Sequence, residues 1–479
     1  MRLAYSVDQV RRAEGELMAR LPERALMQRA AGGLAIVLAR VLRDCGGVYG
    51  ARVVLLVGPG DNGGDALYAG ARLAGRGVAV HAVLADESAR AHPGGLSALL
   101  AAGGRIGTAE ALDGADLVVD GMLGIGGRGG LRGKAAELAR VARRCGAPIV
   151  AVDLPSGVDA DAGTVEGEAV SAEVTVTFGA YKPGLFVDPA AAYAGVVEFV
   201  DIGLGPWPAR SAAVEVLQRS DVAALLPVPA RETDKYGRGV VGVDCGSARY
   251  PGAAHLVVGA ALHSGVGALR YVGPVDIVRE HPETLLGDGR VQAWVVGCGI
   301  DTDVAAQFRV AKALRDGAVP VLVDADGLSV LAKMGGGRAR LTDRAAPTVL
   351  TPHAGEAARL LGVERADVEA RRLEHVRRLA DTFGATVLLK GSTTLVAEPG
   401  NPTVRANPTG TSALATAGSG DVLAGLIGGL LAAGLSAFDA AGAGAYLHGM
   451  TGRLAAARGP VSARDLLEAL PRAWHNVSQ

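Results

Sequence analysis

A short stretch near the C-terminus combines residue types that could bind a phosphate group and move a proton. It is Ala417–Gly425, which reads Ala-Gly-Ser-Gly-Asp-Val-Leu-Ala-Gly. A Gly-rich turn that enters a helix offers unpaired N–H groups and the positive end of the helix dipole, so it suits an anion. The apolar residues after Asp421 predict a helix that is buried on nearly all sides. From Asn407 to Gly452 the only other charged residue is Asp439, so we expect Asp421 to be the only carboxylate at this anion site. A capping role is the simpler interpretation, but it leaves the preceding Gly-Ser-Gly unexplained.

Polar, Gly-rich loops also follow predicted strands in the first half of the chain. The strand Arg52–Val57 leads into Gly58–Asp65, and a helix is expected from Ala66 onward. The spacing of this loop fits neither the dinucleotide-binding fingerprint nor a P-loop. Later strands end in the loops 120–130, 153–159 and 177–184. Because the carboxyl ends of parallel strands meet at one edge of a sheet, we expect a shared polar edge there. Its side chains are Asn62, Asp65, Asp120, Asp153, Ser156 and Lys182.

These loops need a framework of strands alternating with helices, and the apolar pattern predicts one. Helices are expected at 8–20 and 26–43, and strands of the first half at 52–57, 78–84, 117–120, 149–153 and 174–178. A stretch from Gly203 to Asp234 that is rich in Pro is a candidate boundary. After it, strands are expected at 240–244, 268–272, 293–296, 321–324, 348–350, 386–390 and 394–397. This alternation predicts an α/β fold with two domains.

Composition narrows the class of protein. A chain of 479 residues with 49% hydrophobic and 20% charged residues is expected to form two or three globular domains. A net charge of -1 gives no reason to expect a nucleic acid or an acidic membrane surface as partner. The four cysteines lie far apart without a Cys-x-x-Cys pair, so neither a disulfide framework nor a zinc site is expected, and a cytoplasmic location fits best. The N-terminus has no apolar signal core, and the uncharged run Val422–Phe438 is interpreted as a core helix, so no membrane span is expected.

In combination these motifs resemble a known family. The second half is similar to ADP- or ATP-dependent NAD(P)H-hydrate dehydratases of the ribokinase-like fold, through the motifs at 324–328, 350–356, 389–391 and 418–425. The first half resembles NAD(P)H-hydrate epimerases, through 58–65, Asp120 and 153–159. Both halves together resemble the bifunctional bacterial repair enzymes over nearly the whole chain. The resemblance implies two three-layer αβα domains, a Rossmann-like epimerase domain at 1–215 and a ribokinase-like dehydratase domain at 216–479.

The family repairs hydrated nicotinamide cofactors. NADH and NADPH can hydrate at the nicotinamide ring to give R and S epimers, NADHX and NADPHX. The family's epimerase interconverts the epimers, and its dehydratase restores the S form while ADP, the co-substrate, is converted to AMP and phosphate. The resemblance implies Asp421 as the general base. It places the hydrate at Ala253, Gly299, His353 and Asp421, and ADP at Lys390, Gly391, Ser392, Thr393, Thr394 and Gly420. For His353, a purely structural role in its turn is the alternative.

In the epimerase half the resemblance implies a bound potassium ion. Asn62, Asp120 and Ser156 occupy the matching positions, and their oxygen atoms suit a hard cation. The hydrate-binding positions are Asp61, Asn62, Gly63, Gly64, Asp65, Gly124, Ile125, Gly126, Gly127, Arg128, Gly129, Gly130 and Asp153. Asp153 is expected to be the acid/base group; the alternative is a carboxylate that only fixes its loop. Magnesium is a further ion expected with ADP, and a homo-oligomer is compatible with the sequence.

The chain departs from the family pattern at four places. Asp61 stands where the family usually has Asn, Ala66 replaces a frequent Gly, 297–301 reads Gly-Cys-Gly-Ile-Asp, and Thr409–Leu414 resembles a short insertion. Two other functions remain open at this point. One is a ribokinase-like small-molecule kinase with a fused binding domain, which would make a stable phosphorylated product. The other is a non-catalytic nucleotide- or partner-binding protein, which would show no turnover.

Overall fold

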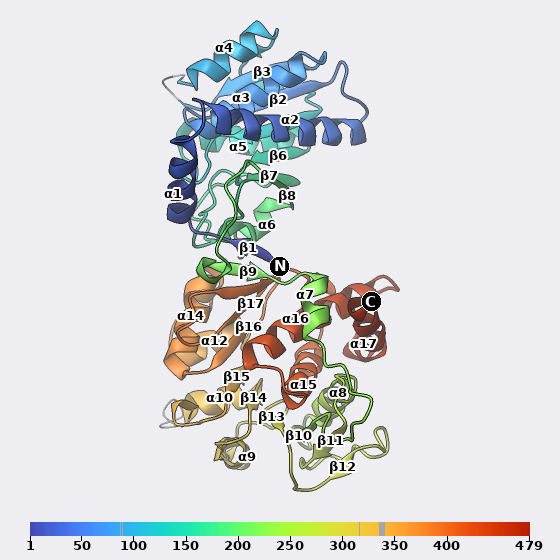
Figure 1. Cartoon of the computed structure of the whole chain (residues 1–479). Helices are drawn as coiled ribbons and strands as arrows, with labels where there is room; N and C mark the ends of the chain where they lie inside the picture. Colours follow the sequence, from blue (N-terminus) through green and yellow to red (C-terminus); the bar gives the residue numbers. More distant parts are fainter. Residues whose placement is uncertain (87, 89, 316, 335–340) are drawn as a thin grey trace. The chain divides into compact units, whose positions relative to one another are not determined.

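The chain folds into two compact units. The computed structural model describes residues 1–86, 88, 90–315, 317–334 and 341–479. Its contacts separate Leu3–Val214 from Glu215–Gln479, which also includes Met1 and Arg2. Two short strands, β1 (Arg2–Ala4) and β9 (Val214–Val216), lie where the chain passes from one unit to the other (Figure 1). Each unit is described by itself below.

The first unit is built on a parallel sheet in the strand order β4-β3-β2-β5-β6-β7-β8. The strands are β2 (Arg52–Val57), β3 (Ala79–Leu84), β4 (Arg105–Ile106), β5 (Leu117–Gly121), β6 (Ile149–Val152), β7 (Val174–Phe178) and β8 (Val196–Val200). Successive side chains of a strand point to opposite faces. Leu55 accordingly packs into a core with α2 and α3, whereas Leu56 packs into a second core with α5. The unit is therefore a three-layer αβα sandwich, as expected.

The helices of this unit are α1 (Val7–Met18), α2 (Ala25–Asp44), α3 (Asp61–Ala74), α4 (Pro93–Ala101), α5 (Gly133–Cys145) and α6 (Ala191–Ala194). Among the described helices, α2 alone is long and apolar enough to cross a membrane, but half of its most apolar window is buried inside the protein. Leu34, Leu38 and Leu42 of α2 are fully buried in the core. This burial accounts for its apolar character as that of a core helix.

The second unit has a mixed sheet. The short strands β1 and β9 form one end of this sheet, with β9 next to β18. From there the order is β18 (Val404–Asn407), β17 (Thr394–Ala397), β16 (Thr386–Leu389), β15 (Thr348–Leu350), β14 (Val321–Val323), β13 (Ala293–Val296), β10 (Val240–Asp244), β11 (Ala268–Tyr271) and β12 (Leu285–Leu286). The pairs from β16 to β12 are parallel, whereas β17 runs antiparallel to both of its neighbours. Most carboxyl ends of the strands therefore lie at one edge.

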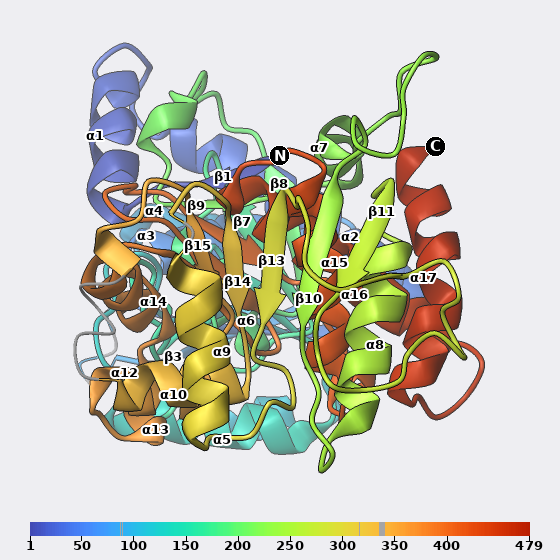
Figure 2. The same cartoon turned by 90° about the horizontal axis from the view of Figure 1, so that it is seen from below.

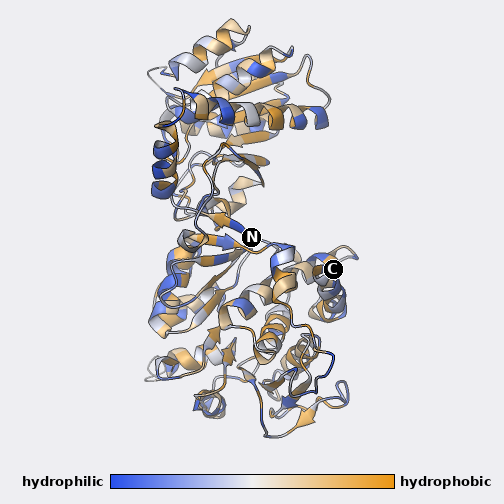
Figure 3. Cartoon of the chain, in the orientation of Figure 1, coloured by the Kyte–Doolittle hydropathy of each residue, from blue (hydrophilic) through white to orange (hydrophobic). Residues whose placement is uncertain are grey.

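Helices cover both faces of this sheet. They are α7 (Arg219–Leu225), α8 (Pro251–Leu262), α9 (Val304–Arg315), α10 (Asp326–Lys333), α12 (Ala354–Leu361), α13 (Arg365–Ala370), α14 (Arg372–Phe383), α15 (Ser419–Ala432), α16 (Ala437–Ala456) and α17 (Ala463–Ser478). Figures 1 and 2 show α15 and α16 on one side of β13 and β14 and α9 and α10 on the other. In α15 every residue from Val422 to Ala432 is buried, which confirms the fully buried helix predicted from the sequence. Figure 3 shows the apolar residues concentrated on the strands of both units.

The expected strands are all present with bounds within one residue, but the start of α3 was predicted wrongly. The helix begins at Asp61 instead of Ala66, since Gly60 is its extended N-cap and Gly64 N donates to Gly60 O at 3.1 Å. Glycine in a first turn looks like a loop in the sequence because its helix propensity is low. Gly63 is required here by packing: a Cβ atom would lie 2.1 Å from Gly58 O. The strands β8 and β18 were not predicted.

Candidate active sites

The polar edge expected in the first unit is present, and Asn62 holds two of its loops together. Its Nδ2 donates to Val152 O at 2.8 Å and to Leu123 O at 3.0 Å. These carbonyl groups lie at the end of β6 and just after β5. With both N–H bonds directed at carbonyl groups, the Oδ1 atom of Asn62 faces Gly124, where a Cβ would approach it to 2.8 Å. The amide therefore presents an acceptor oxygen to the Gly-rich loop.

Asp120 and Ser156 form one buried unit beside Asn62. Ser156 donates from Oγ to Asp120 Oδ1 at 2.6 Å and from its backbone N to Oδ2 at 2.8 Å. The Ser156 hydroxyl also accepts from Leu123 N at 2.8 Å, so the backbone of Leu123 contacts two of the predicted ion ligands, Asn62 and Ser156. Asp120 accepts from the backbone N of Met122, the residue before Leu123, at 3.3 Å. Burial raises the pKa of Asp120 to about 6, although the hydrogen bonds from Ser156 and Met122 oppose the shift.

Asp153 has a strained backbone and a buried cation beside it. Its φ of 66° is one that residues with side chains rarely adopt. Asp153 Oδ1 accepts hydrogen bonds from the ammonium group of Lys182, from Thr177 Oγ1 at 3.1 Å and from Phe178 N at 3.2 Å. The Lys182 side chain is only 1% exposed. Three donors therefore fix one oxygen of Asp153 in position.

Asp65 lies in the same carboxylate cluster with a different set of neighbours. It is buried, and among the described residues its Oδ1 has no hydrogen-bond partner. Burial raises the pKa of Asp65 well above its ordinary value, and the nearby charges of Asp153, Asp61 and Glu14 raise it further. Asp65 is thus protonated under conditions in which an ordinary carboxyl group is ionised.

The Gly-rich loop after β5 is held by tight backbone contacts. At Gly130 a Cβ would lie 2.4 Å from Glu166 O, and at Gly126 it would lie 3.4 Å from the Arg11 guanidinium. The remaining predicted positions Gly124, Ile125, Gly127 and Gly129 are partly exposed, and Arg128 is exposed. Asp61 is exposed in the first turn of α3. The loop therefore has room for a ligand on its outer side only.

In the second unit, the first turn of α15 has the geometry of an anion site. Gly418 is the N-cap with φ of 88°, where a side chain would be strained and its Cβ would lie 2.4 Å from Leu256. Ser419 Oγ donates to Leu414 O at 2.7 Å and so fixes the approach to the helix. At Gly420 a Cβ would lie 3.5 Å from Lys390 Nζ and 3.8 Å from Asp324 Oδ2. The turn therefore faces a cation and a carboxylate that come from other strands.

Asp421 is not the only carboxylate at this site, so that expectation was wrong. Burial raises the pKa of Asp421 to about 7, and the charge of Asp324 adds to the shift. Asp324 is 1% exposed at the end of β14, far from Asp421 in the sequence but next to it in the sheet. The thiol of Cys298 also hydrogen-bonds Asp421 and lowers its pKa slightly against these two effects. A carboxyl group with a pKa near 7 is suited to act as a general base at neutral pH.

Lys390 joins the carboxylates at the ends of the strands. Its Nζ lies 2.8 Å from Asp324 Oδ1 and 3.8 Å from Glu356 Oε2. Although burial lowers the pKa of Lys390, these two charges raise it above its ordinary value. The loop that follows is shaped by the buried Arg372, which donates to Lys390 O at 3.0 Å and Thr393 O at 3.2 Å. In this loop Gly391 and Ser392 are exposed, Thr393 is buried and Thr394 begins β17.

His353 has a structural role in its turn, the alternative to the ligand binding expected from the sequence. Its Nδ1 accepts from Gly355 N at 3.0 Å and from Glu356 N at 3.2 Å, so it caps α12. The ring remains 54% exposed, which leaves its outer side free to contact a ligand as well. Ala253 and Gly299 are neighbours, because a Cβ at Gly299 would lie 2.8 Å from Ala253 Cβ.

Two of the four departures of the sequence from the family pattern, the Gly-Cys-Gly segment and Thr409–Leu414, are fixed in place by contacts in the structure. In the Gly-Cys-Gly segment, Gly297 has φ of 120° and a Cβ there would lie 2.1 Å from Asp324 O. Gly299 has φ of 62°, so Cys298 lies between two glycines whose backbone conformations disfavour a side chain. The segment Thr409–Leu414 is fastened by Arg453, which donates to the carbonyl groups of Thr409 and Gly410 at 2.7 and 3.3 Å. Neither departure removes Asp421 from its helix turn.

Comparisons with known proteins agree with this arrangement. A family described as NAD(P)H-hydrate dehydratase matches residues 241–472, and one described as YjeF-related protein N-terminus matches residues 23–184. A bifunctional NAD(P)H-hydrate repair enzyme of Mycobacterium tuberculosis is 49% identical over 446 residues, which cover 91% of this chain and 90% of the relative. The chain belongs to the family of bifunctional NAD(P)H-hydrate repair enzymes. A repair enzyme of Corynebacterium glutamicum is 36% identical over 90% of this chain and 87% of its own length.

The fold of the dehydratase half is supported by a solved structure. A crystal structure of an ADP/ATP-dependent NAD(P)H-hydrate dehydratase from Bacillus subtilis, co-crystallized with ATP/Mg2+, superposes with a TM-score of 0.50 at 31% identity. It covers 54% of this chain and 97% of the Bacillus chain. The ribokinase-like architecture expected for the second half of this repair enzyme is thereby confirmed.

Several residues at these sites were missed in the sequence. Asp324 ends the predicted strand 321–324 and belongs to the motif 324–328, but it was given no role beside Asp421. Lys182 was placed on the edge but given no role. No feature of the sequence indicated that Arg372 organises the loop after β16, because its contacts are to backbone carbonyl groups and depend on the fold.

Proposed function

We propose that this repair enzyme restores both epimers of hydrated NADH and NADPH. In this proposal residues 1–215 interconvert the R and S epimers, and residues 216–479 dehydrate the S epimer at the expense of ADP. The single observation that carries the dehydratase assignment is the arrangement at α15, where Asp421, with a pKa of about 7, stands next to the Lys390–Asp324 ion pair at a Gly-rich helix N-terminus. This arrangement combines a base, a cation and an anion site in one place.

The proposed dehydration proceeds through a phosphorylated intermediate, because hydroxide is a poor leaving group. Asp421 takes the proton of the ring hydroxyl group. The oxygen of that hydroxyl group attacks the terminal phosphorus of ADP, and AMP leaves. The carbon–oxygen bond then breaks with loss of a proton from the neighbouring ring carbon, which restores the double bond and releases phosphate. The N–H groups of Gly420 and Asp421 at the start of α15 face the charge that builds up on the phosphoryl oxygens.

The nucleotide is proposed to lie along the loop after β16. Lys390 offers its charge to a phosphate, and Gly391, Ser392, Thr393 and Thr394 line the rest of the site with Gly420. Magnesium bound with the nucleotide would neutralise phosphate charge, and the carboxylate of Asp324, 2.8 Å from Lys390 Nζ, would offer it an oxygen ligand. The hydrate is proposed to contact the adjacent residues Ala253 and Gly299 and the exposed side of His353.

The epimerase half offers an acid and a base in one cluster. The hydrated ring carries its hydroxyl group next to the ring nitrogen, so loss of water gives an iminium ion and re-addition at the other face inverts the centre. We assign Asp65, protonated because of its raised pKa, as the acid that donates a proton to the leaving hydroxyl group. Asp153 is assigned as the base that takes a proton from the incoming water. The Lys182 ammonium group positions Asp153 by holding its Oδ1 and leaves the other oxygen for this task.

A potassium ion fits the cluster of Asn62, Asp120 and Ser156. Asp120 is a fully buried carboxylate for which no cationic partner is found among the described residues, and burial raises its pKa to about 6. A monovalent cation would supply the missing positive charge, and Asn62 Oδ1 and the oxygens of Asp120 and Ser156 would hold it. The ion would stabilise the loop that follows β5, since all three residues contact or face that loop.

The test of this function is a repair assay with acid-hydrated NADPH. The full chain, ADP, magnesium and potassium are mixed with the hydrate, and the absorbance of the restored dihydronicotinamide is followed together with AMP and phosphate. We expect one AMP and one phosphate for each NADPH formed. A stable phosphorylated hydrate that accumulates without NADPH would instead identify a small-molecule kinase.

A further inference from the structure

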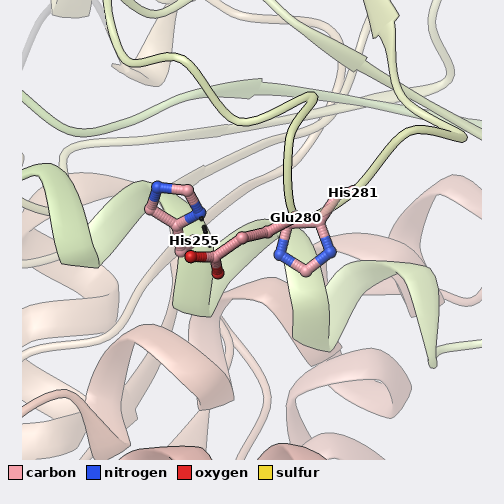
Figure 4. A group of neighbouring side chains, drawn as sticks. All are labelled: His255, Glu280 and His281. Atoms are coloured by element: carbon pink, nitrogen blue, oxygen red, sulfur yellow. Dashed lines mark ion pairs between the residues drawn. The ribbon is translucent and has the colours of Figure 1, made fainter.

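Three metal-binding side chains meet in the second unit outside the groups described so far. They are His255 on α8 and the consecutive residues Glu280 and His281 in the segment between β11 and β12 (Figure 4). One ligand atom from each lies within 4.8 Å of the others. His255 Nδ1 is 3.4 Å from Glu280 Oε2, and the two imidazole rings have their centroids 6.1 Å apart. Two imidazoles and one carboxylate therefore converge from two separate segments.

One of the three spacings matches that of a tetrahedral metal ion, and the other two lie within 4.8 Å. With zinc–ligand distances of about 2.0–2.1 Å, two ligand atoms of a tetrahedron are about 3.4 Å apart. That is the separation found between His255 and Glu280. His255 Nδ1 is moreover a buried atom that makes no hydrogen bond among the described residues, since its 3.4 Å contact with Glu280 Oε2 is an ion-pair contact only. Buried polar atoms without a hydrogen bond are rare in folded proteins.

The backbone holds the three side chains in place without a metal ion. Ile277 is fully buried, and its carbonyl oxygen accepts from Glu280 N at 3.2 Å and from His281 N at 2.9 Å. His255 is fixed by α8, whose neighbouring residue Ala254 is fully buried in the core. Gly259, one turn after His255, makes room for the second ring, because a Cβ there would lie 3.3 Å from His281 Cε1. The site is thus largely formed before any ion binds.

We propose that His255, Glu280 and His281 bind a divalent transition-metal ion, for which Zn2+ is the best match, with water at the fourth position. Neutral imidazoles and a carboxylate are borderline ligands that suit zinc better than magnesium or calcium. The bound ion fastens the turn 277–281 onto α8 and acts as a structural clamp. The cysteine spacing had indicated no zinc site, and this one contains no cysteine.

The proposed ion is separate from the dehydration chemistry. Ala253, at the proposed hydrate site, is two residues before His255 on the same helix, and two residues turn a helix by about 200°. The two side chains therefore point to opposite sides of α8. Occupancy of the zinc site is expected to change stability and to leave the ADP-dependent reaction at its basal rate.

Zinc binding to the full chain, free of any tag and stripped with a chelator, tests this proposal. Calorimetry is expected to give one Zn2+ per chain with a Kd of about 1 µM or lower. Binding is expected to weaken by at least about 100-fold in Glu280→Gln and in His281→Gln, since each removes a ligand. An excess of zinc should raise the melting temperature of the wild type by roughly 5 °C and leave these variants unchanged.

Two matched controls separate this site from general surface binding. His263→Gln removes an exposed histidine at the end of α8, and Glu283→Gln removes an exposed acid near His281. Both are expected to bind zinc as the wild type does. X-ray absorption of the zinc-loaded wild type should show two imidazole ligands and no sulfur ligand. This measurement does not depend on any variant. Sulfur ligation, wild-type affinity in both Glu280→Gln and His281→Gln, or no binding at about 100 µM zinc would overturn the proposal.

Discussion

The ammonium group of Lys390 lies 2.8 Å from the buried carboxylate of Asp324, next to Gly420 in the first turn of α15. This pair brings together the ends of β14 and β16 and sets the electrostatics around Asp421. Burial is the largest cause of the raised pKa of Asp421; the charge of Asp324 adds to the shift, and Lys390 opposes it. The pair thus adjusts the strength of this base and keeps a cation available for phosphate.

Replacing the base should separate activity from stability. Asp421→Asn is expected to abolish dehydration while ADP still binds, because the amide keeps the shape but cannot accept the proton. At pH 8 it should also stabilise the chain by about 1–3 kcal/mol, because an ionised carboxylate is removed from a site that disfavours it. Assays of NADPH formation, nucleotide binding and thermal unfolding measure the three effects.

As a control, Asp465→Asn alters a capping residue of α17 and should leave the activity intact. Full activity of Asp421→Asn would show that Asp421 is not the base; a capping role would not replace it, since Gly418 is the N-cap of α15 and no side-chain cap hydrogen bond is made there.

The raised pKa of Asp421 sets the pH dependence of both the stability of the chain and its dehydratase activity. The folded-state pKa of about 7 lies above the ordinary value of 3.8 for an aspartate, so the folded chain binds this proton more tightly than the unfolded chain does. Stability from this group is therefore fully present below pH 3.8 and is lost as the pH rises through about 7. The gain in Asp421→Asn should accordingly shrink as the pH falls toward 4. The kcat/KM for the S hydrate should fall about tenfold per unit below pH 7; a flat profile there would argue against Asp421 as the base.

Removing one charge of the Lys390–Asp324 ion pair should cost more stability than removing both. Lys390→Met leaves Asp324 buried without its cation, and a loss of about 3 kcal/mol is expected, together with weaker ADP binding. Adding Asp324→Leu should recover most of the stability without recovering activity. Denaturant unfolding and nucleotide titration measure the two effects. If the single and double variants are equally unstable, the destabilisation does not arise from the unpaired carboxylate.

Asp153→Asn should expose the division of work between the two halves. The initial rate on the S hydrate is expected to stay near normal, but a mixed sample should be repaired in two phases. The fast phase should match the S fraction and the slow phase the uncatalysed interconversion, and isolated residues 1–215 added in trans should restore a single phase. Lys182→Met should slow the epimerisation less than Asp153→Asn, since Lys182 acts only by positioning. One fast phase to completion in Asp153→Asn would transfer the acid/base role to Asp65 or to no carboxylate of this cluster.

Much of the fold could be predicted because strands buried on both faces give continuous apolar runs. The polar loops could be located because they follow these apolar runs. The structure joins Asn62 and Ser156 through Leu123, and Ser156 to Asp120. The start of α3 could not be predicted, since the glycines of its first turn are required by packing and not favoured by helix propensity: Gly63 lies against Gly58, and Gly64 against Met27 and His92.

The partners of the predicted residues were harder to foresee than the residues themselves. Asp421 looked isolated because its charged neighbours Asp324 and Lys390 come from other strands. Lys182 was visible as a lysine in a polar loop, but its contact with Asp153 depends on how the ends of β6 and β7 lie beside each other. Pairwise electrostatics of this kind require the sheet order, which the sequence does not state.

The most direct measurement of the central claim is the stoichiometry of repair by the full chain. With acid-hydrated NADPH, ADP, magnesium and potassium, the account predicts conversion of both epimers to NADPH, with one AMP and one phosphate released for each. Asp421→Asn should form no NADPH under the same conditions. NADPH formation without consumption of ADP, or consumption of ADP without NADPH formation, would contradict the account.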